Sequence, residues 1–171
     1  MPATLPRPIS AAALALLVAC ATPGGPGVPV AIDPGVDFNA YRTFDFVPIP
    51  ASVTSAMSPS LGYFGVDRVL ATDLATVGLS RSLGGQPDVL VAYFAGGTVV
   101  NTDAWGYASG SAAGISVLDV PASSLVVDVV DARMRKLVWR GVAEGALLGP
   151  QNVDPAVRQM LRSYWPARQR Y

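Results

Sequence analysis

Few side chains in this sequence are suited to chemistry. Its 171 residues include no histidine, which excludes Ser-His and Cys-His nucleophilic systems and metal sites built on imidazole. The one lysine, Lys136, falls at an expected exposed turn, where a desolvated Schiff-base amine is not expected. No glycine-rich run leads into Gly-Lys-Ser/Thr, so no phosphate-binding loop is indicated. The remaining option is chemistry that uses carboxylates.

Two carboxylic acids at a suitable separation can act as acid and base in a hydrolysis. Asp128 and Asp131 lie three positions apart on an expected strand, so their side chains point to opposite faces. We expect Asp128 to form an ion pair with Arg140, Asp131 to face a turn, and Asp88 to cap the start of a strand. The sequence therefore identifies no catalytic residue and no metal ligand.

The one cysteine, Cys20, follows the eleven-residue apolar run "ISAAALALLVA", which is too short to span a membrane. The basic Arg7, the apolar run and the small residues after it predict a secretory signal peptide. Leu17-Val18-Ala19-Cys20 resembles a bacterial lipobox, in which the cysteine sulfur carries a diacylglycerol and the chain is cut between Ala19 and Cys20. The alternative is a signal peptide cut elsewhere, with an incidental cysteine.

A lipobox cysteine would anchor the protein to a membrane. A diacylglycerol and an N-acyl chain such as palmitate, at about 0.8 kcal/mol per buried CH₂, make such anchoring practically permanent. Ala21, where an aspartate commonly retains Gram-negative lipoproteins in the inner membrane, favours the periplasmic face of the outer membrane. The segment 22–30, "TPGGPGVPV", has the composition of a flexible tether. We therefore expect a signal peptide at 1–19, a lipidated cysteine and tether at 20–32, and one domain at 33–171.

Charge and composition exclude one class of partner. Twelve basic residues balance twelve acidic ones, and loss of Arg7 with the signal peptide leaves the mature chain with one net negative charge. A near-neutral chain has no electrostatic basis for binding nucleic acid. Apart from the lipid on Cys20, no cofactor is expected. The partners that stay open are the membrane and an envelope protein, lipid or glycan.

Periodicity predicts the first elements of the domain. Residues 41–47, "YRTFDFV", alternate as in a strand, and Val66 to Val77 carry the apolar stripe of an amphipathic helix that Gly78 ends as a C-cap. Residues 88–95 are apolar on both faces, which indicates a central strand. Residues 96–114 follow as a long loop of small residues.

A hairpin and a second helix complete the pattern. Residues 124–147, "SLVVDVVDARMRKLVWRGVAEGAL", form two strands around the turn 133–135, with Arg135 left-handed and Ala132 opposite Lys136. This register places Val129 and Trp139 on the inner face, with Leu125, Val127 and Ala143, and pairs Asp128 with Arg140 across the outer face. Asp154 and Pro155 then predict the start of a helix that ends before Pro166, with Val157, Met160, Leu161 and Tyr164 on its apolar face. We expect an α+β fold of two layers, a largely antiparallel β-sheet with two α-helices packed on one face.

Four segments, in this order, resemble the bacterial lipoprotein family known as domain of unknown function 4136: "DFNAYRTFDF", "VGLSRSLGGQPDVLVAYFAG", the hairpin sequence above, and the closing helix before "WP". The match covers most of 37–166, and its most specific part is 128–141, with its aspartates, tryptophan and Arg-Gly. Arg135 stands where a glycine is usual, which costs about 1 kcal/mol if that residue is left-handed. The resemblance implies a periplasmic lipoprotein and no assigned reaction or catalytic residue.

Two classes of function stay open. The favoured one is an outer-membrane-anchored periplasmic lipoprotein that is not an enzyme and has a binding or structural role in the envelope. The alternative is a carboxylate-dependent envelope hydrolase or transferase, which needs two carboxylates converging in one pocket. Trp139 is expected in the core. Trp105 and Tyr107 stand among small residues without periodicity, so we interpret their loop as a candidate interaction surface.

Overall fold

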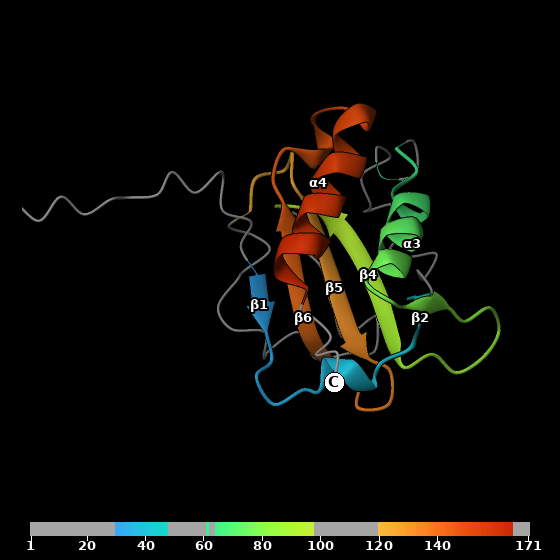
Figure 1. Cartoon of the computed structure of the whole chain (residues 1–171). Helices are drawn as coiled ribbons and strands as arrows, with labels where there is room; N and C mark the ends of the chain where they lie inside the picture. The colour runs from blue at the N-terminus through green and yellow to red at the C-terminus, as the bar shows by residue number, and fades with distance from the viewer. Residues whose placement is uncertain (1–29, 48–60, 62–63, 98–119, 166–171) are drawn as a thin grey trace, which may run out of the picture.

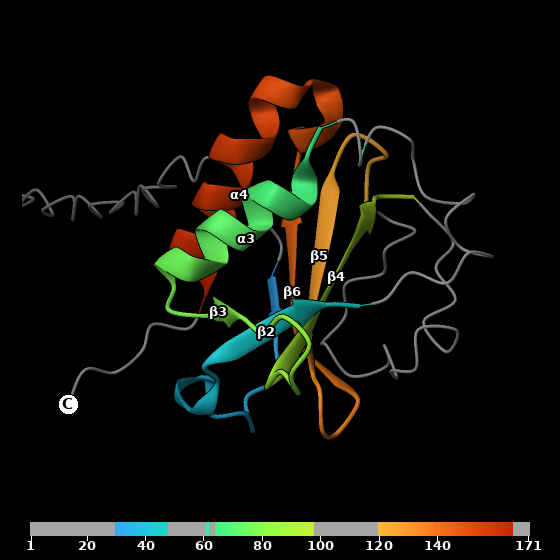
Figure 2. The same ribbon diagram turned by 90° about the vertical axis from the view of Figure 1, so that its right-hand side faces the viewer.

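The computed structural model describes residues 30–47, 61, 64–97 and 120–165. They form a six-stranded sheet with two helices over one of its faces (Figures 1 and 2). The strands are β1 (Val30–Ile32), β2 (Thr43–Phe46), β3 (Ser80–Arg81), β4 (Val89–Ala95), β5 (Leu125–Asp131) and β6 (Lys136–Ala143), and the helices are α3 (Val66–Thr76) and α4 (Pro150–Tyr164). Two short 3₁₀ turns, η1 (Phe38–Ala40) and η4 (Ala146–Leu148), lie between them. The expected α+β architecture with both helices on one face is confirmed.

The sheet order is β1-β6-β5-β4-β2-β3. In this order, each neighbouring pair among β1, β6, β5 and β4 is antiparallel. Strand β2, in contrast, runs parallel to both of its neighbours, β4 and β3. The sheet is therefore largely antiparallel but mixed. A parallel pair needs a long crossover connection, and α3 supplies it between β2 and β3.

Helix α3 ends where the sequence predicts. Gly78 is left-handed, with φ of 89°, and its N–H donates to the carbonyl of Ala75. The next N–H, of Leu79, donates to the carbonyl of Leu74 at 3.0 Å. This pattern is a Schellman-type cap, which a glycine adopts without steric cost.

Helix α4 begins earlier than expected. It starts at Pro150, after Gly149, and Pro155 lies inside it rather than at its first position. Pro150 can begin a helix because its missing N–H would have no partner there. Asp154 is consequently no N-cap, and its Oδ1 accepts instead from Arg158 one turn later, at 2.6 Å.

The hairpin confirms most of the expected register. Val129 lies opposite Trp139, and Asp128 lies opposite Arg140. Near the turn the register shifts by one, so that Asp131, not Ala132, faces Lys136. The turn is one residue longer than expected, and a β-bulge between the Val129 and Val130 pairs restores the register.

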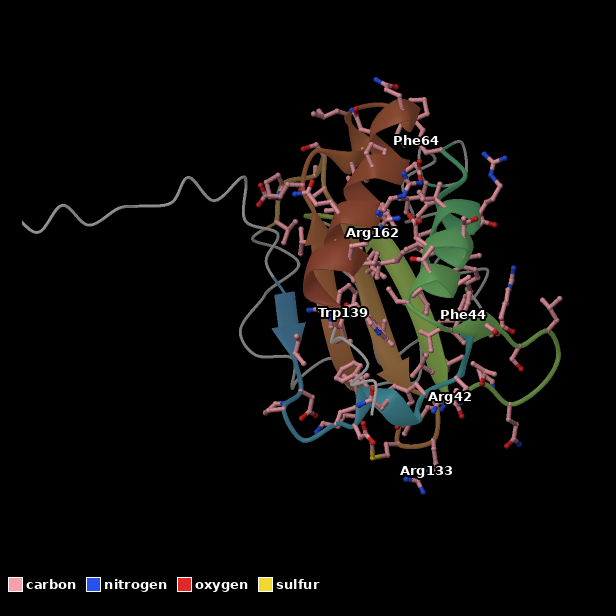
Figure 3. The ribbon with its side chains drawn as sticks, viewed as in Figure 1. Arg42, Phe44, Phe64, Arg133, Trp139 and Arg162 are labelled. Atoms are coloured by element: carbon pink, nitrogen blue, oxygen red, sulfur yellow. The ribbon has the colours of Figure 1, made fainter. Side chains whose placement is uncertain are left out.

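Both faces of β4, β5 and β6 are largely buried. This was expected for residues 88–95 but not for the hairpin, whose Asp128 and Arg140 were expected on an outer face. The helix-side cluster contains Trp139, Phe44 and the inner residues of the hairpin (Figure 3). A second cluster occupies the opposite face and contains Val47, Ala92, Phe94, Val120, Val126, Val130, Leu137 and Val142. Asp128 and Arg140 belong to that second face and are 0% and 4% exposed. Their ion pair is therefore buried rather than at the surface.

Strand β1 occupies the last three residues of the expected tether. Val30 to Ile32 pair with Gly141 to Trp139 of β6, and the Asp33 N–H then donates to the carbonyl of Val138 at 2.9 Å. An ion pair of 2.5 Å joins Lys136 Nζ to Asp33 Oδ2. Three residues that were assigned to the tether, Val30 to Ile32, thus belong to the sheet.

Candidate functional site

A cavity of about 220 Å³ opens beside the end of β2. Phe46 and Val47 line it from β2 and the residue after it, Val91–Tyr93 from β4, Arg81 from β3 and Asp67 from the first turn of α3. Strand β2 stops at Phe46, opposite Val91, whereas β4 continues to Ala95 (Figure 2). We call this cavity the aromatic pocket, because Phe46 and Tyr93 are among the residues that line it.

The guanidinium of Arg81 is held in place at the aromatic pocket. Its Nε donates to Asp45 Oδ1 at 3.2 Å, and its central carbon lies 4.9 Å from the centroid of the Phe46 ring. The side chain is 43% exposed, so the ion pair itself contributes at most about 1 kcal/mol of stability. Ring and carboxylate together fix where the other guanidinium N–H groups can point.

Tyr93 supplies the second ring and a hydroxyl. The ring meets that of Phe46 edge to face, with centroids 5.8 Å apart, and the side chain is half-buried. Burial raises the pKa of the Tyr93 phenol, and the nearby Asp67 carboxylate raises it further, while Arg81 partly opposes both. The phenol therefore stays protonated at neutral pH and can both donate and accept a hydrogen bond.

Asp67 contributes a carboxylate at the solvent side of the pocket. It lies in the first turn of α3, where a negative charge interacts favourably with the helix dipole, and its side chain is exposed. It is the one carboxylate among the residues that line this pocket. The pocket therefore brings together two aromatic rings, one of which carries a hydroxyl, with a guanidinium and a carboxylate.

The acids that sequence reasoning examined are engaged in structural bonds. Asp128 Oδ1 and Oδ2 accept from Arg140 Nε and Nη2 at 2.6 and 2.7 Å. Asp131 Oδ1 accepts from the N–H groups of Arg133 and Met134, so it faces the turn as predicted. The Oδ2 atom of Asp131 accepts a hydrogen bond from the Tyr41 hydroxyl at 3.0 Å. Burial and the Asp131 carboxylate raise the pKa of Tyr41, so its hydroxyl stays protonated.

Asp88 has the structural role that was predicted, but its carboxylate caps the start of β2 and not the start of β4, the strand that it precedes. Its Oδ2 accepts from the N–H groups of Arg42 and Thr43 at 2.8 and 2.9 Å and from the Thr43 hydroxyl at 3.0 Å. These bonds, first that from Arg42, lower the pKa of Asp88. The carboxylate thus joins the start of β2 to the start of β4. Asp88, Asp128 and Asp131 are not among the residues that line the aromatic pocket.

Trp139 lies in the core, as expected, and is 0% exposed. Its ring lies so close over Gly141 that a Cβ at position 141 would come within 2.3 Å of it. The glycine of the Trp-Arg-Gly sequence in β6 therefore has a packing reason. Positions 139 and 141 lie on the helix-facing side of the strand, and only a glycine at 141 leaves room for the Trp139 ring.

The other predicted site residues lie outside the described residues. They are the cleavage pair Ala19 and Cys20, the lipid attachment at Cys20, and the candidate interaction residues Trp105 and Tyr107. Among the residues described, no three His, Cys, Asp or Glu side chains lie close enough to hold a metal ion. In the same part of the chain, no helix has the length and apolar character needed to cross a membrane.

Sequence reasoning missed the aromatic pocket. Its charged residues, Asp67 and Arg81, come from an amphipathic helix and a two-residue strand, where exposed charges are ordinary. One signal was available: Tyr93 places a hydroxyl in the otherwise apolar strand β4, and a half-buried hydroxyl commonly has a partner.

The fold and the pocket define a class: an α+β domain with a small aromatic cavity at a strand end. A family model described as domain of unknown function (DUF4136) matches residues 28–166, so this chain belongs to that family. No curated protein matches the chain.

Two solved structures superimpose on this chain, and the first is similar to it in fold. A PDZ domain protein from Parabacteroides distasonis superimposes with a TM-score of 0.51 at 15% identity, over 84% of this chain and 36% of its own. This chain thus spans about a third of that protein. PelC from Paraburkholderia phytofirmans, a dodecamer, has a TM-score of 0.47 at 12% identity, over 84% of this chain and 98% of its own.

Proposed function

We propose that this protein is a lipid-anchored protein of the bacterial envelope, held at the periplasmic face of the outer membrane through Cys20, and that its domain binds a partner without catalysing a reaction. The observation that carries the binding role is the aromatic pocket, where Asp45 and the Phe46 ring hold the Arg81 guanidinium beside the Tyr93 phenol. Aromatic rings and arginine are the side chains that most often dominate binding energies.

The state of the acids supports binding over the carboxylate-dependent alternative. A hydrolase of that kind needs two carboxylates facing one cleft. Asp67 is the one acid that lines the aromatic pocket. The other acids considered accept structural hydrogen bonds: Asp88 from backbone N–H groups, Asp128 from Arg140 and Asp131 from Tyr41.

Membrane fractionation tests the anchor. The wild-type chain and Cys20→Ser are expressed in a Gram-negative host, and membranes are washed with carbonate. We expect the wild type in the membrane fraction and the exported serine variant in the soluble fraction, because only the cysteine sulfur can carry the diacylglycerol. Retention of the exported serine variant after the wash would contradict the proposal.

Capture from solubilised envelopes tests the binding role. Tagged wild-type protein and Arg81→Ala are compared, with Arg68→Ala as a matched control, since Arg68 is an exposed arginine on α3 outside the pocket lining. We expect capture of the same partner by the wild type and the control, and its loss in Arg81→Ala. Equal capture by all three would contradict a role for the pocket.

Trp105 and Tyr107 are proposed as a second contact with the partner. Large rings among small residues make anchors of low entropic cost. The double alanine variant is expected to melt within a degree or two of the wild type and to lose capture. If it instead unfolds several degrees earlier, the rings belong to the core.

A further inference from the structure

We propose that the aromatic pocket binds one neutral, hydroxyl-rich ring, a hexose unit of an envelope glycan or a free hexose. This inference rests on the proposed binding function and assigns the chemistry of its ligand. Four properties of the pocket support it: size, hydrogen-bonding groups, charge and wall chemistry.

The size of the pocket restricts the ligand to a single small unit. Its volume of about 220 Å³ lies below the range of about 300–1,000 Å³ that is typical of sites for drug-sized molecules. Asp67 and Arg81 are both exposed, so the pocket meets solvent on their side. A ring can enter there while the rest of a longer chain stays outside.

The polar groups of the pocket match hydroxyls. Arg81 only donates hydrogen bonds, the Asp67 carboxylate only accepts them, and the protonated Tyr93 phenol does both. A hydroxyl group also does both, so adjacent hydroxyls on one ring can accept from Arg81 and donate to Asp67. A carboxylate or an ammonium group could satisfy only one of these two side chains.

Charge disfavours ionic ligands. An anion attracted to Arg81 would also be repelled by the Asp67 carboxylate of the pocket lining. The attraction itself is weakened because Asp45, behind the guanidinium, already forms an ion pair with it at 3.2 Å. A cation attracted to Asp67 would meet Arg81. A neutral polyol avoids both repulsions and uses both groups.

The walls of the pocket match the other side of a sugar. Between its hydroxyls, a pyranose presents apolar C–H faces, and the partly buried aromatic residues Phe46 and Tyr93 can cover them. The buried Val47, Val91 and Ala92 close the apolar floor of the pocket. The Arg81 guanidinium is already held by Asp45 and the Phe46 ring, so little side-chain entropy is lost when it bonds a hydroxyl. The pocket is therefore organised before the ligand arrives.

Chemical-shift mapping tests this directly. The full chain, labelled with ¹⁵N and held in detergent micelles, is titrated with glucose, galactose and N-acetylglucosamine, and in parallel with acetate and butylammonium. We expect a hexose to shift the amides of Phe46, Ala92 and Tyr93 in the millimolar range, and the ionic probes to leave them unchanged. A tetrasaccharide of the best unit, if it binds more tightly than its monosaccharide, identifies a glycan chain as the source, whereas equal affinity identifies the free sugar.

Variants separate the pocket from the rest of the surface. Tyr93→Phe keeps the ring packing and removes the hydroxyl, so we expect severalfold weaker binding. Arg81→Ala should weaken binding at least tenfold, and Arg68→Ala should not change it. Stronger shifts with acetate or butylammonium than with every sugar, or sugar shifts confined to residues away from the pocket, would overturn the inference. If capture from envelopes depends on Arg81 while no sugar binds, the binding function stands and the sugar assignment is wrong.

Discussion

The buried ion pair between Asp128 and Arg140 gives the sharpest stability prediction. Two bonds of 2.6 and 2.7 Å join the groups side by side, and their side chains are 0% and 5% exposed. Removing one partner leaves the other charge buried without this ion pair, which costs about 3–5 kcal/mol. Replacing both with apolar residues of similar size removes both desolvation costs and is commonly neutral or stabilising.

A double-mutant cycle measures this difference. Asp128→Val and Arg140→Met are made singly and together, and the free energy of unfolding is obtained from urea titrations. We expect each single variant to lose about 3–5 kcal/mol and the double variant to lie within about 1 kcal/mol of the wild type. Arg81→Ala is the control, because its exposed ion pair with Asp45 predicts a loss of about 0–1 kcal/mol. Single variants that lose less than about 1 kcal/mol would show that water reaches the pair, and the inferred burial would be wrong.

Four further predictions concern packing, strain and pH. Trp139→Ala should cost about 3–5 kcal/mol in a thermal melt because it empties a fully buried site, and an unchanged melt would place the ring outside the core. Gly141→Ala should also destabilise, by about 1–3 kcal/mol, since its Cβ would meet the Trp139 ring; a neutral effect would show that the ring can move aside. Arg135→Gly should stabilise by about 0.5–1 kcal/mol in urea unfolding, because Arg135 is left-handed with φ of 54°, and a loss of stability would contradict strain there. Burial raises the pKa of Asp73, so its ionisation opposes folding as pH rises through that pKa, whereas the lowered pKa of Asp88 adds stability that is lost as pH falls below its unfolded value. Asp73→Asn should therefore raise the melting temperature at pH 7 and not at pH 3, while Asp88→Asn should lower it at pH 7 and less at pH 3; the reverse order would refute these assignments.

Local signals predicted the elements of the fold well. The apolar stripe before Gly78 marks α3 because helix packing and the left-handed cap are decided within a few residues. The register that pairs Val129 with Trp139 follows from alternation alone, since a slip by one would have mixed polar and apolar faces. The bulge near the turn was not predicted because a turn longer by one residue leaves the alternating pattern almost unchanged.

Features that depend on distant parts of the chain were missed. Nothing in "YRTFDFV" distinguishes a parallel from an antiparallel neighbour, so the pairing of β2 with β4 could not be derived from it. The second buried face had a visible signal, because Val126, Val130, Leu137 and Val142 are apolar beside Asp128 and Arg140. A strand that is apolar on both faces is typical of burial on both sides, a rule applied to β4 but not to the hairpin.

The aromatic pocket was missed for a related reason, although the Tyr93 hydroxyl was one signal of it. Its groups come from four separate elements, and the ion pair that orients Arg81 joins residues 36 positions apart. In a single sequence each of these residues is an ordinary exposed charge or strand aromatic. Only the end of β2 beside the continuing β4 brings them together.

If the protein is anchored through Cys20 as proposed, the pairing of β1 with β6 limits how far the domain can stand from the membrane. With Val30 held in the sheet, ten Cα–Cα steps join it to Cys20, and a fully extended chain of that length spans at most about 35 Å. On the proposed anchoring, the edge of the sheet at β1 thus stays within about one domain diameter of the lipid surface. The protein could search a thin layer of the periplasm next to the bilayer, and a partner fixed farther away than this reach would be inaccessible to it.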